Sequence, residues 1–398
     1  MKLRIATRKS ALALAQTTMA ADAIVAANKN SNAATISATA SAITSATDVA
    51  STAEPLTYEL VSMTTEGDRR LDKSLASFGG KGVFIKELEI ALLENRADIA
   101  IHSLKDMPAE VLPQFKLAAV LKREDPRDAF LSRGGADGIR FMDLPAGARV
   151  GTGSIRRIVQ LKALRPDIEY VPIRGNIQTR IGKLAELDGV VLAAAGLKRM
   201  GLADQVTEYF STEQMLPASG QGILAIETLA DKNFGPHNGS LQGDNNEIKS
   251  AVILEKRNDD RIHENGLLAQ ILARANDLET FCIASAEMAY LKALNAGCQF
   301  PVASFAEFVD DSLDACNCGD SSNRGGIGKP VVRDSSNHNS SMSGVVKTLK
   351  IRGIYWDEKS SRQLRAECVG SVDLNFADAV QQSKNLGIEL AQEIKKQL

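Results

Sequence analysis

The sequence has few aromatic residues, few cysteines and no excess of charge of either sign. Aromatic residues make up 5% of the 398 residues, and there are five cysteines. The 47 basic and 49 acidic residues leave a net charge of −2, which argues against a polybasic binder of nucleic acid or membrane surfaces. No apolar run approaches the roughly 18 residues of a membrane helix. We therefore expect a globular protein with neither nucleic-acid nor membrane partners.

The first residues imitate a targeting signal without forming one. Basic residues precede the apolar stretch Ala11–Ala15, but this stretch is too short for a signal peptide and stops at Gln16. The pattern favours a strand over Leu3–Thr7 and a helix from Ser10. Five cysteines in a chain of this length do not form a disulfide scaffold, and unpaired thiols suit a reducing cytoplasm.

Polar stretches divide the chain. Ala, Ser or Thr occupy 17 of the 21 residues in 33–53, and Ser, Asn or Gly occupy 16 of the 28 in 317–344. Such composition cannot bury enough surface to offset ordering entropy, so we predict flexible insertions at about 28–53 and 310–345. A polar linker is expected at 231–246. The predicted domains are 1–122 with about 218–235, then 123–217, and a C-terminal domain at 247–398.

Strands alternate with helices through the body of the chain, which indicates an α/β fold. Strands are predicted at 4–7, 58–63, 98–102, 149–151, 170–173 and 190–194, and helices at 83–95, 177–186 and 284–294. The segment Arg4–Thr7 resembles Arg149–Thr152, and 97–106 resembles 188–199. These repeats predict two α/β domains of one kind, joined by hinges at Arg123–Arg127 and Leu216–Gly222.

Arginines gather where predicted strands end. Any one of them would pass as a surface charge, but cations at helix starts oppose the helix dipole, so stability alone would not select the set. Ligands of open α/β sheets bind at these ends, and arginine forks bind carboxylates and phosphates. We infer a cleft for a ligand with several anionic groups; phosphate is less favoured because no P-loop spacing is present. The six arginines are Arg8, Arg156, Arg157, Arg174, Arg180 and Arg199.

Two further residues carry chemistry. Asp106 follows a predicted buried strand, where a carboxylate is either a general acid/base and cation stabiliser or an ordinary turn residue. Cys298 lies in a Gly- and Pro-containing loop, where a cysteine is either an exposed thiolate or a small buried hydrophobe. Cys316 and Cys318 have only His338 as a nearby further ligand, so no metal site is predicted.

Several segments resemble, in order, those of the porphobilinogen deaminase (hydroxymethylbilane synthase) family. The resemblance implies an α/β protein of three domains: two periplasmic-binding-protein-like (type II) domains with a cleft between them, and a smaller α+β C-terminal domain. The segments are Leu3–Ser10, Gly79–Gly82, Glu94–Asp106, Arg123–Phe130, Ser154–Arg157, Arg174–Asn176, Ala195–Arg199 and Leu216–Gly222.

The resemblance also implies an activity. A cytoplasmic, monomeric transferase of haem biosynthesis would condense four porphobilinogen molecules head to tail onto a dipyrromethane cofactor, releasing ammonia, and then free hydroxymethylbilane by hydrolysis. The cofactor would be attached through a thioether to Cys298, and Asp106 would be the catalytic residue. Lys81, Ser103, Lys105, Thr152, Ser154, Arg156 and Arg157 match cofactor-binding positions. Arg8, Ser10, Gln16, Arg174 and Arg180 match positions near the substrate, and Arg199 completes the basic cleft.

The chain departs from the family pattern at four residues, and its two insertions are atypical as well. Gly153 stands where many members have serine, Met288 stands where arginine is usual, Ala296 replaces a glycine, and Phe300 replaces a smaller β-branched residue. If that glycine needed a positive φ, Ala296 would be strained.

Three other functions are compatible with parts of the pattern. The main alternative is a non-catalytic two-domain polycarboxylate-binding protein, which leaves Asp106 and Cys298 without a role. A regulator's effector domain lacks a helix-turn-helix pattern, and a phosphate-binding transferase lacks the P-loop. Release of ammonia from porphobilinogen would separate the enzyme from all three.

Overall fold

The computed structural model describes residues 1–39, 55–65, 85–230, 261–296, 300–310, 331–332, 345–357 and 360–398. Lys81, Cys298, the linker expected at 231–246 and most of both predicted insertions lie outside these ranges.

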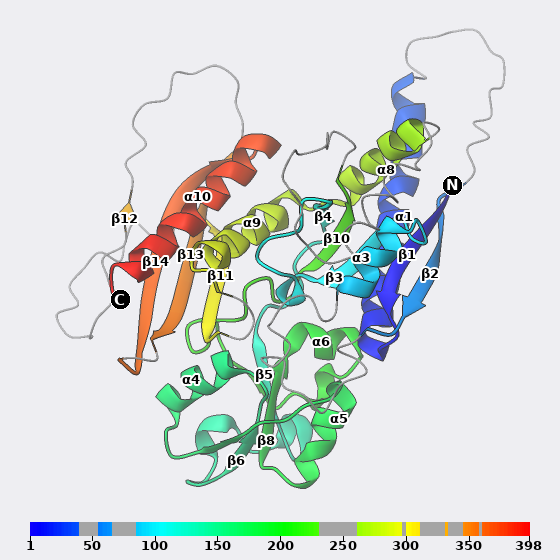
Figure 1. Cartoon of the computed structure of the whole chain (residues 1–398). Helices are drawn as coiled ribbons and strands as arrows, with labels where there is room; N and C mark the ends of the chain where they lie inside the picture. The colour runs from blue at the N-terminus through cyan, green and yellow to red at the C-terminus, as the bar shows by residue number, and fades with distance from the viewer. Residues whose placement is uncertain are drawn as a thin grey trace, which may run out of the picture.

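Domain 1 is built on a five-stranded sheet of order β2-β1-β3-β10-β4 (Figure 1). Strand β1 runs parallel to β2 and β3, whereas β10 is antiparallel to both of its neighbours. Alternate buried apolar residues, such as Leu3 and Ile5 in β1, form its core with α1. The elements are β1 (Lys2–Arg8), α1 (Ala11–Thr39), β2 (Thr57–Met63), α3 (Lys86–Leu93), β3 (Ile99–Ser103), the 3-10 turn η2 (Leu104–Asp106), β4 (Phe115–Val120) and β10 (Leu224–Leu229).

Two predictions about this domain need correction. Helix α1 continues to Thr39, so residues 28–39 are helical where we expected a flexible insertion. Helix α8 (Arg261–Ala275) was assigned to the C-terminal domain. Its Ile271 and Leu272 instead join the core of domain 1, because they complete the apolar contacts of α1.

Domain 2 has a second five-stranded sheet, of order β7-β6-β8-β5-β9. The two sheets share one strand order. When the strands are counted within each domain, the order is second, first, third, then the strand that enters from the other domain (β10 in domain 1, β5 in domain 2), and fourth. This shared order confirms the predicted repeat. The elements are β5 (Asp128–Ser132), η3 (Gly135–Asp137), η4 (Phe141–Asp143), β6 (Arg149–Gly151), α4 (Ile155–Leu164), β7 (Glu169–Val171), α5 (Ile177–Gly182), η5 (Lys183–Ala185), β8 (Gly189–Ala193), α6 (Ala194–Arg199), η6 (Ala203–Gln205) and β9 (Glu208–Tyr209).

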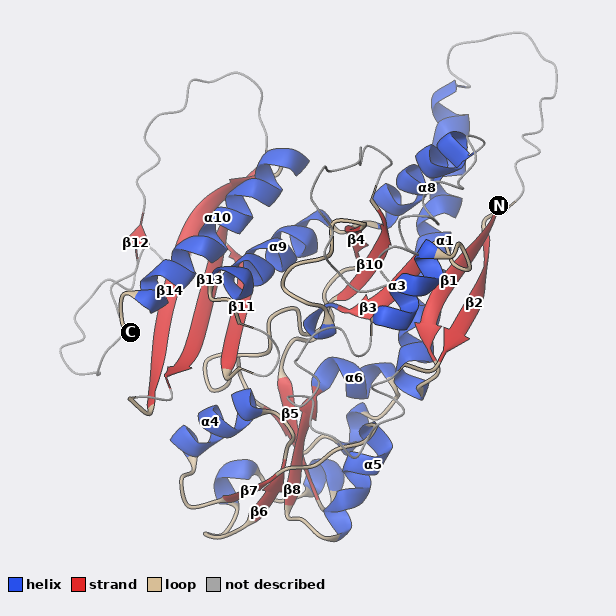
Figure 2. Cartoon of the chain, viewed as in Figure 1, coloured by secondary structure: helices blue, strands red, loops and turns tan. Residues whose placement is uncertain are grey.

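The C-terminal domain pairs a four-stranded sheet, β11-β13-β14-β12, with two helices (Figure 2). Tyr290 of α9 and Leu390 of α10 lie fully buried against the sheet. The elements are α9 (Leu278–Ala293), β11 (Val302–Val309), β12 (Val331–Val332), β13 (Val346–Asp357), β14 (Arg362–Asp373) and α10 (Phe376–Lys395). The predicted class is thus confirmed: two domains arranged as in a type II periplasmic binding protein, plus a smaller α+β domain.

The two segments that join domains 1 and 2 are hydrogen-bonded to each other. Glu124 donates its backbone N–H to the carbonyl of Gly222 (3.1 Å), and Arg123 Nε donates to the carbonyl of Gln221 (2.9 Å). Gly222 has φ of 90°, and a Cβ there would lie 2.3 Å from the Glu124 carbonyl oxygen. Only glycine fits this conformation and this close approach.

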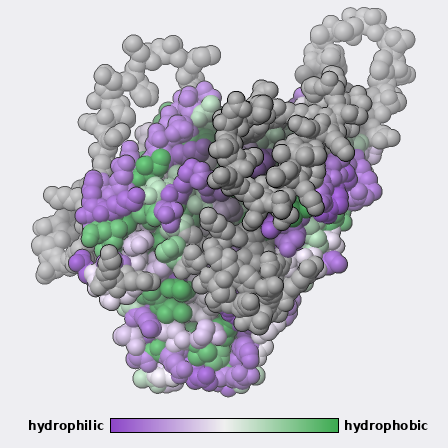
Figure 3. Space-filling view, in the orientation of Figure 1, coloured by the Kyte–Doolittle hydropathy of each residue, from purple (hydrophilic) through white to green (hydrophobic). Residues whose placement is uncertain are grey.

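The described surface carries no extended apolar face in the view of Figure 3, where hydrophilic residues surround smaller hydrophobic patches. Large exposed apolar side chains, such as Ile139 and Met142 of domain 2, are scattered, which is usual for globular proteins. Among the described residues, no helix combines the length and apolar character needed to cross a membrane.

Candidate functional site

The domain 1 side of the site is the turn that follows β3. This strand is a buried run that ends at Ser103, and the backbone N–H of Leu104 donates to the Ile223 carbonyl (3.0 Å), which fixes the turn η2. Lys105 and Asp106 then leave the sheet, with Lys105 half-buried and Asp106 exposed. His102 points elsewhere, because its ring bonds the buried Glu227 at 2.9 Å.

The domain 2 side is the start of α4, directly after β6. Thr152 is buried, and its hydroxyl accepts a hydrogen bond from the N–H of Ser154 (3.3 Å). Ser154 occupies the N-cap position, but its hydroxyl does not cap the helix. Arg156 and Arg157 follow in the first turn and are 6% and 5% exposed.

One buried carboxylate, Asp128 at the start of β5, pairs with both of these arginines. Its Oδ1 accepts hydrogen bonds from Nε (3.0 Å) and Nη2 (2.7 Å) of Arg157. Its Oδ2 lies 2.7 Å from Nη2 of Arg156. Burial acts to raise the pKa of Asp128, but the two guanidinium groups outweigh burial and hold it well below its usual range.

Five cations and Asp106 share one electrostatic environment. The pKa of Lys105 is lowered to about 8, chiefly by burial and also by the charges of Arg157 and Arg156, against the opposing effect of Asp106 and Asp128. Burial lowers the pKa of Arg180 as well, with contributions from Arg157 and Arg174. The predicted site residues from the two domains therefore converge. We call Lys105, Arg156, Arg157, Arg174 and Arg180 the basic cluster.

Other predicted site residues lie in different surroundings. The Ser10 hydroxyl accepts from the N–H of Ala13 (3.3 Å) at the start of α1. Gln16 is buried, and Arg8 is half-buried at the end of β1. Arg199 donates to the carbonyl of Gly222 (2.7 Å), and burial lowers its pKa to about 10. Arg199 thus contacts the segment that returns from domain 2 to domain 1.

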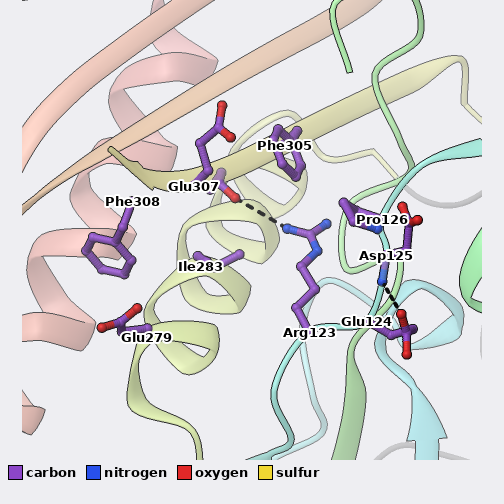
Figure 4. Close-up of a pocket in the computed structure, with 10 residues that line it drawn as sticks. Arg123, Glu124, Asp125, Pro126, Glu279, Ile283, Phe305, Glu307 and Phe308 are labelled. Carbon is purple, nitrogen blue, oxygen red and sulfur yellow. Dashed lines mark hydrogen bonds between the residues drawn. The ribbon is translucent and has the colours of Figure 1, made fainter. Parts of the chain in front are cut away.

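A second buried carboxylate joins three parts of the chain. Glu287 of α9 is fully buried and pairs with Arg123 Nη1 at 2.7 Å. It also accepts from the backbone N–H of Gly220 (2.6 Å) and of Ala306 (2.8 Å). Arg123 lines a cavity of about 340 Å³ between residues Arg123–Pro126, which join domain 1 to domain 2, and elements α9 and β11 (Figure 4). Its guanidinium carbon lies 4.9 Å from the ring centroid of Phe305.

The structure gives physical reasons for two of the departures. A Cβ at Gly153 would lie 2.6 Å from the carbonyl oxygen of Ile173, so a side chain there needs a backbone shift. In the segment before Cys298, the residue with positive φ is Asn295 (φ 52°), not Ala296. The strain considered for Ala296 is therefore absent, and asparagine tolerates this conformation better than most residues.

Sequence reasoning missed Asp128, Gln221 and Glu287. Asp128 opens the apolar run Asp128–Leu131, and a charged residue that opens a buried strand requires a partner. That signal was available, although it does not say which cation is the partner. Gln221 and Glu287 carried no comparable local signal.

The residues of the basic cluster fit a ligand with several carboxylates. Five cations face two carboxylates, Asp106 and Asp128, and the cations disfavour one another's charge. An anionic group bound here would relieve that repulsion, and the lysine and arginine donors have the chemistry that carboxylates require. The donor set therefore suits a dipyrromethane, whose pyrroles carry acetate and propionate groups.

Two α/β domains of one strand order, with basic residues of both around one exposed carboxylate, define a class of two-domain α/β proteins with a shared basic site. The family model described as porphobilinogen deaminase, dipyromethane cofactor binding domain, matches residues 3–234. The porphobilinogen deaminase of Clostridium kluyveri is 46% identical over 258 residues, 64% of this chain and 78% of that protein. That of Clostridium acetobutylicum is 39% identical over 316 residues, 79% of this chain and 87% of that protein. The chain belongs to the porphobilinogen deaminase family.

Solved structures with similar backbones include periplasmic binding proteins. A TRAP periplasmic solute binding protein from Ralstonia eutropha has a TM-score of 0.34 and 11% identity, covering 69% of this chain and 77% of that one. An arginine-specific periplasmic binding protein from Salmonella typhimurium has a TM-score of 0.30 and 15% identity, covering 69% and 99%. The fold class follows from the strand order of the two sheets.

Proposed function

We propose that this chain is a transferase that condenses four porphobilinogen molecules head to tail, releasing ammonia each time, and then hydrolyses the product to hydroxymethylbilane. The observation that carries the proposal is the convergence of the basic cluster and Asp106 within the region, 3–234, that matches the family's cofactor-binding domain. A protein that only bound polycarboxylates would need the cations, but it would have no use for a carboxylate placed among them.

The cofactor would be held by residues of both domains. Lys105, Arg156 and Arg157 supply charge, and Ser103, Thr152 and Ser154 supply hydroxyl groups at strand ends and at the start of α4. Lys81 and the attachment residue Cys298 complete the set proposed from the family resemblance. When bound, the dipyrromethane supplies the pyrrole carbon onto which the first substrate is added.

Asp106 is the acid/base group of the proposed mechanism. Its carboxyl group gives a proton to the departing amine of porphobilinogen, and its carboxylate then stabilises the positive charge left on the substrate. Asp106 is exposed at a turn and surrounded by cations, so it can reach a ligand held by the basic cluster. Arg174 and Arg180 would hold the acetate and propionate of the incoming substrate, with Arg8, Ser10, Gln16 and Arg199 as further proposed contacts.

The proposed cellular setting is the cytoplasm, with the chain acting as a monomer. The described cysteines Cys282 and Cys368 are buried free thiols, which suits a reducing compartment. Size-exclusion chromatography with light scattering tests the monomer: a mass of one chain supports it, and a mass of two chains contradicts it.

The decisive experiment is the intact mass of the purified chain beside a Cys298→Ser variant. We expect an excess equal to two linked pyrrole units in the wild type and none in the variant. An unmodified wild-type mass that persists after incubation with porphobilinogen would contradict the proposal, and the basic cluster would then belong to a non-catalytic binding protein.

A further inference from the structure

Among the residues that the structure describes, the pairing at Asp128 is short of negative charge. Asp128 is fully buried, and Arg156 and Arg157 are each less than a tenth exposed, so two buried guanidinium groups share one carboxylate. Their other hydrogen bonds go to uncharged backbone carbonyls, those of Leu216 (2.6 Å) and Val191 (2.9 Å). Burying an uncompensated cation is costly. An arrangement selected for stability alone would supply a second carboxylate.

Gln221 connects this pairing to the turn of domain 1. Its Nε2 donates to Asp128 Oδ1 (2.9 Å) and to the carbonyl of Pro126 (2.7 Å). Its Oε1 lies 3.5 Å from Nζ of Lys105, the residue next to Asp106. A continuous set of polar contacts therefore runs from the turn that carries Asp106, through Gln221, to Asp128 and the two arginines of domain 2.

We propose that Asp128 is a positioning residue, which holds Arg156 and Arg157 side by side for the carboxylates of the bound group and, through Gln221, fixes that pair relative to the Lys105–Asp106 turn. The identity of the bound group rests on the proposed function, whereas the positioning does not. Asp128 itself does not touch the ligand. Its one negative charge allows two cations to remain adjacent and leaves one positive charge for the ligand.

The positioning role has a consequence that can be measured in the protein alone. Without the Asp128 charge, the two guanidinium groups repel each other and separate. Lys105 also loses an anion that favours its charged form, and only Asp106 remains to oppose burial and the charges of Arg156 and Arg157. The pKa of Lys105 must then fall further below about 8.

The test compares Asp128→Asn with Asp125→Asn in the full-length chain. Asp125 is a matched control because it lies three residues before Asp128, in the segment that joins domain 1 to domain 2, and because its side chain is also little exposed (7%). It pairs with an arginine, Arg127, at 2.7 Å, and does not contact the basic cluster. Two quantities report on the ligand: the fraction of chains that carry the two-pyrrole mass, and KM against kcat for porphobilinogen. A third, the Lys105 titration, is followed by NMR of the ¹³C-dimethylated amine.

For Asp128→Asn we expect loss of most of the two-pyrrole mass, a rise in KM of roughly tenfold or more and a lowered Lys105 titration. For Asp125→Asn we expect wild-type values of all three. If both variants lose thermal stability alike while KM and the Lys105 titration stay at wild-type values, Asp128 is structural only and the proposal is wrong.

Two outcomes remain informative if Asp128→Asn alone does not fold. The double variant Asp128→Asn/Arg156→Gln restores the charge balance, so it should fold and its Lys105 should titrate close to the wild-type pH. A double variant whose Lys105 titrates well below the wild-type pH contradicts the proposal. If the wild type carries no cofactor, the proposed function fails, but the Lys105 titration still decides the role of Asp128.

Discussion

Two buried clusters of arginine and carboxylate occupy the interior, and they are balanced differently. At Glu287, one carboxylate meets one guanidinium group and two backbone N–H groups, so charge and hydrogen bonds are matched. At Asp128, one carboxylate meets two guanidinium groups, so a positive charge remains. A matched cluster joins parts of a structure, whereas an unmatched one keeps, among the described residues, a positive charge that a bound anion can neutralise.

The largest expected effect separates rate from stability beside the unmatched cluster. Asp106→Asn should lower turnover by about 10²–10⁴-fold, because it removes the acid/base group, and should leave the melting temperature unchanged because Asp106 is exposed. Ammonia release and thermal unfolding by circular dichroism measure the two quantities. Glu110→Gln is the control, since Glu110 is an exposed carboxylate that pairs with Lys292 at 2.8 Å. Near-normal turnover of Asp106→Asn would remove Asp106 from the mechanism.

The second effect tests the matched cluster. Glu287→Ala leaves Arg123 buried without its charge partner and two backbone N–H groups without an acceptor, so we expect a loss of about 3–5 kcal/mol in unfolding free energy. Glu279→Ala on the same helix removes a half-exposed partner of Lys347 and should cost less than about 1 kcal/mol. Urea unfolding measures both. Equal losses would mean that the Glu287 cluster does not join the domains.

The third expected effect is a gain in stability, opposite in sign to the loss expected for Glu287→Ala. Lys105 has its pKa lowered to about 8 by burial, against 10.5 when unfolded, so its charged form is disfavoured in the folded state. This destabilisation is fully present below pH 8 and disappears as the pH rises through 10.5. Lys105→Met should therefore raise the melting temperature at pH 7, by an amount that shrinks towards pH 9.5, while cofactor is lost.

Lys122→Met provides the comparison, because Lys122 is exposed and its removal should change the melting temperature little at either pH. A fall in the melting temperature of Lys105→Met at pH 7 would show that Lys105 stabilises the fold. It would contradict the expectation that Lys105 serves ligand binding at a cost in stability.

The smallest effect concerns the edge of the basic cluster. Gly153→Ser places a Cβ 2.6 Å from the Ile173 carbonyl oxygen, and the required shift should cost about 1 kcal/mol or more. Gly182→Ser is the control, because nothing lies within 4 Å of a Cβ at that position. Thermal unfolding of both variants checks this. Equal melting temperatures would mean that the loop adjusts freely and that steric crowding does not explain the glycine.

Features that depend on residues close together in the sequence could be predicted, whereas contacts between residues far apart in the sequence could not. Strands such as Gly189–Ala193 follow from local apolar runs, and the basic residues after their ends follow from the strands. The partners could not be predicted in this way. Arg123 and Glu287 are far apart in sequence, and nothing local links them, so both the Glu287 cluster and the contact of Arg199 with Gly222 required the folded chain.

Residues that fit two environments were also misassigned. The apolar side chains of α8 suit either neighbouring domain, and only the packing of Ile271 and Leu272 on domain 1 decides between them. Helix α1 continues past the expected boundary to Thr39, although the composition there resembles a linker. Composition limits the structures that a segment can adopt, and its packing partners determine which of them it adopts.

The strand order of domain 1 has a consequence for synthesis. Strand β10 lies between β3 and β4, yet it follows β4 in the chain only after the whole of domain 2. During translation the sheet of domain 1 therefore lacks strand β10, between β3 and β4, until domain 2 has been synthesised. Domain 2, whose strands β5 to β9 are contiguous, can fold first. The ribosome thus delivers the second domain before the first is finished, and the long closure should make completion of domain 1 the slow step.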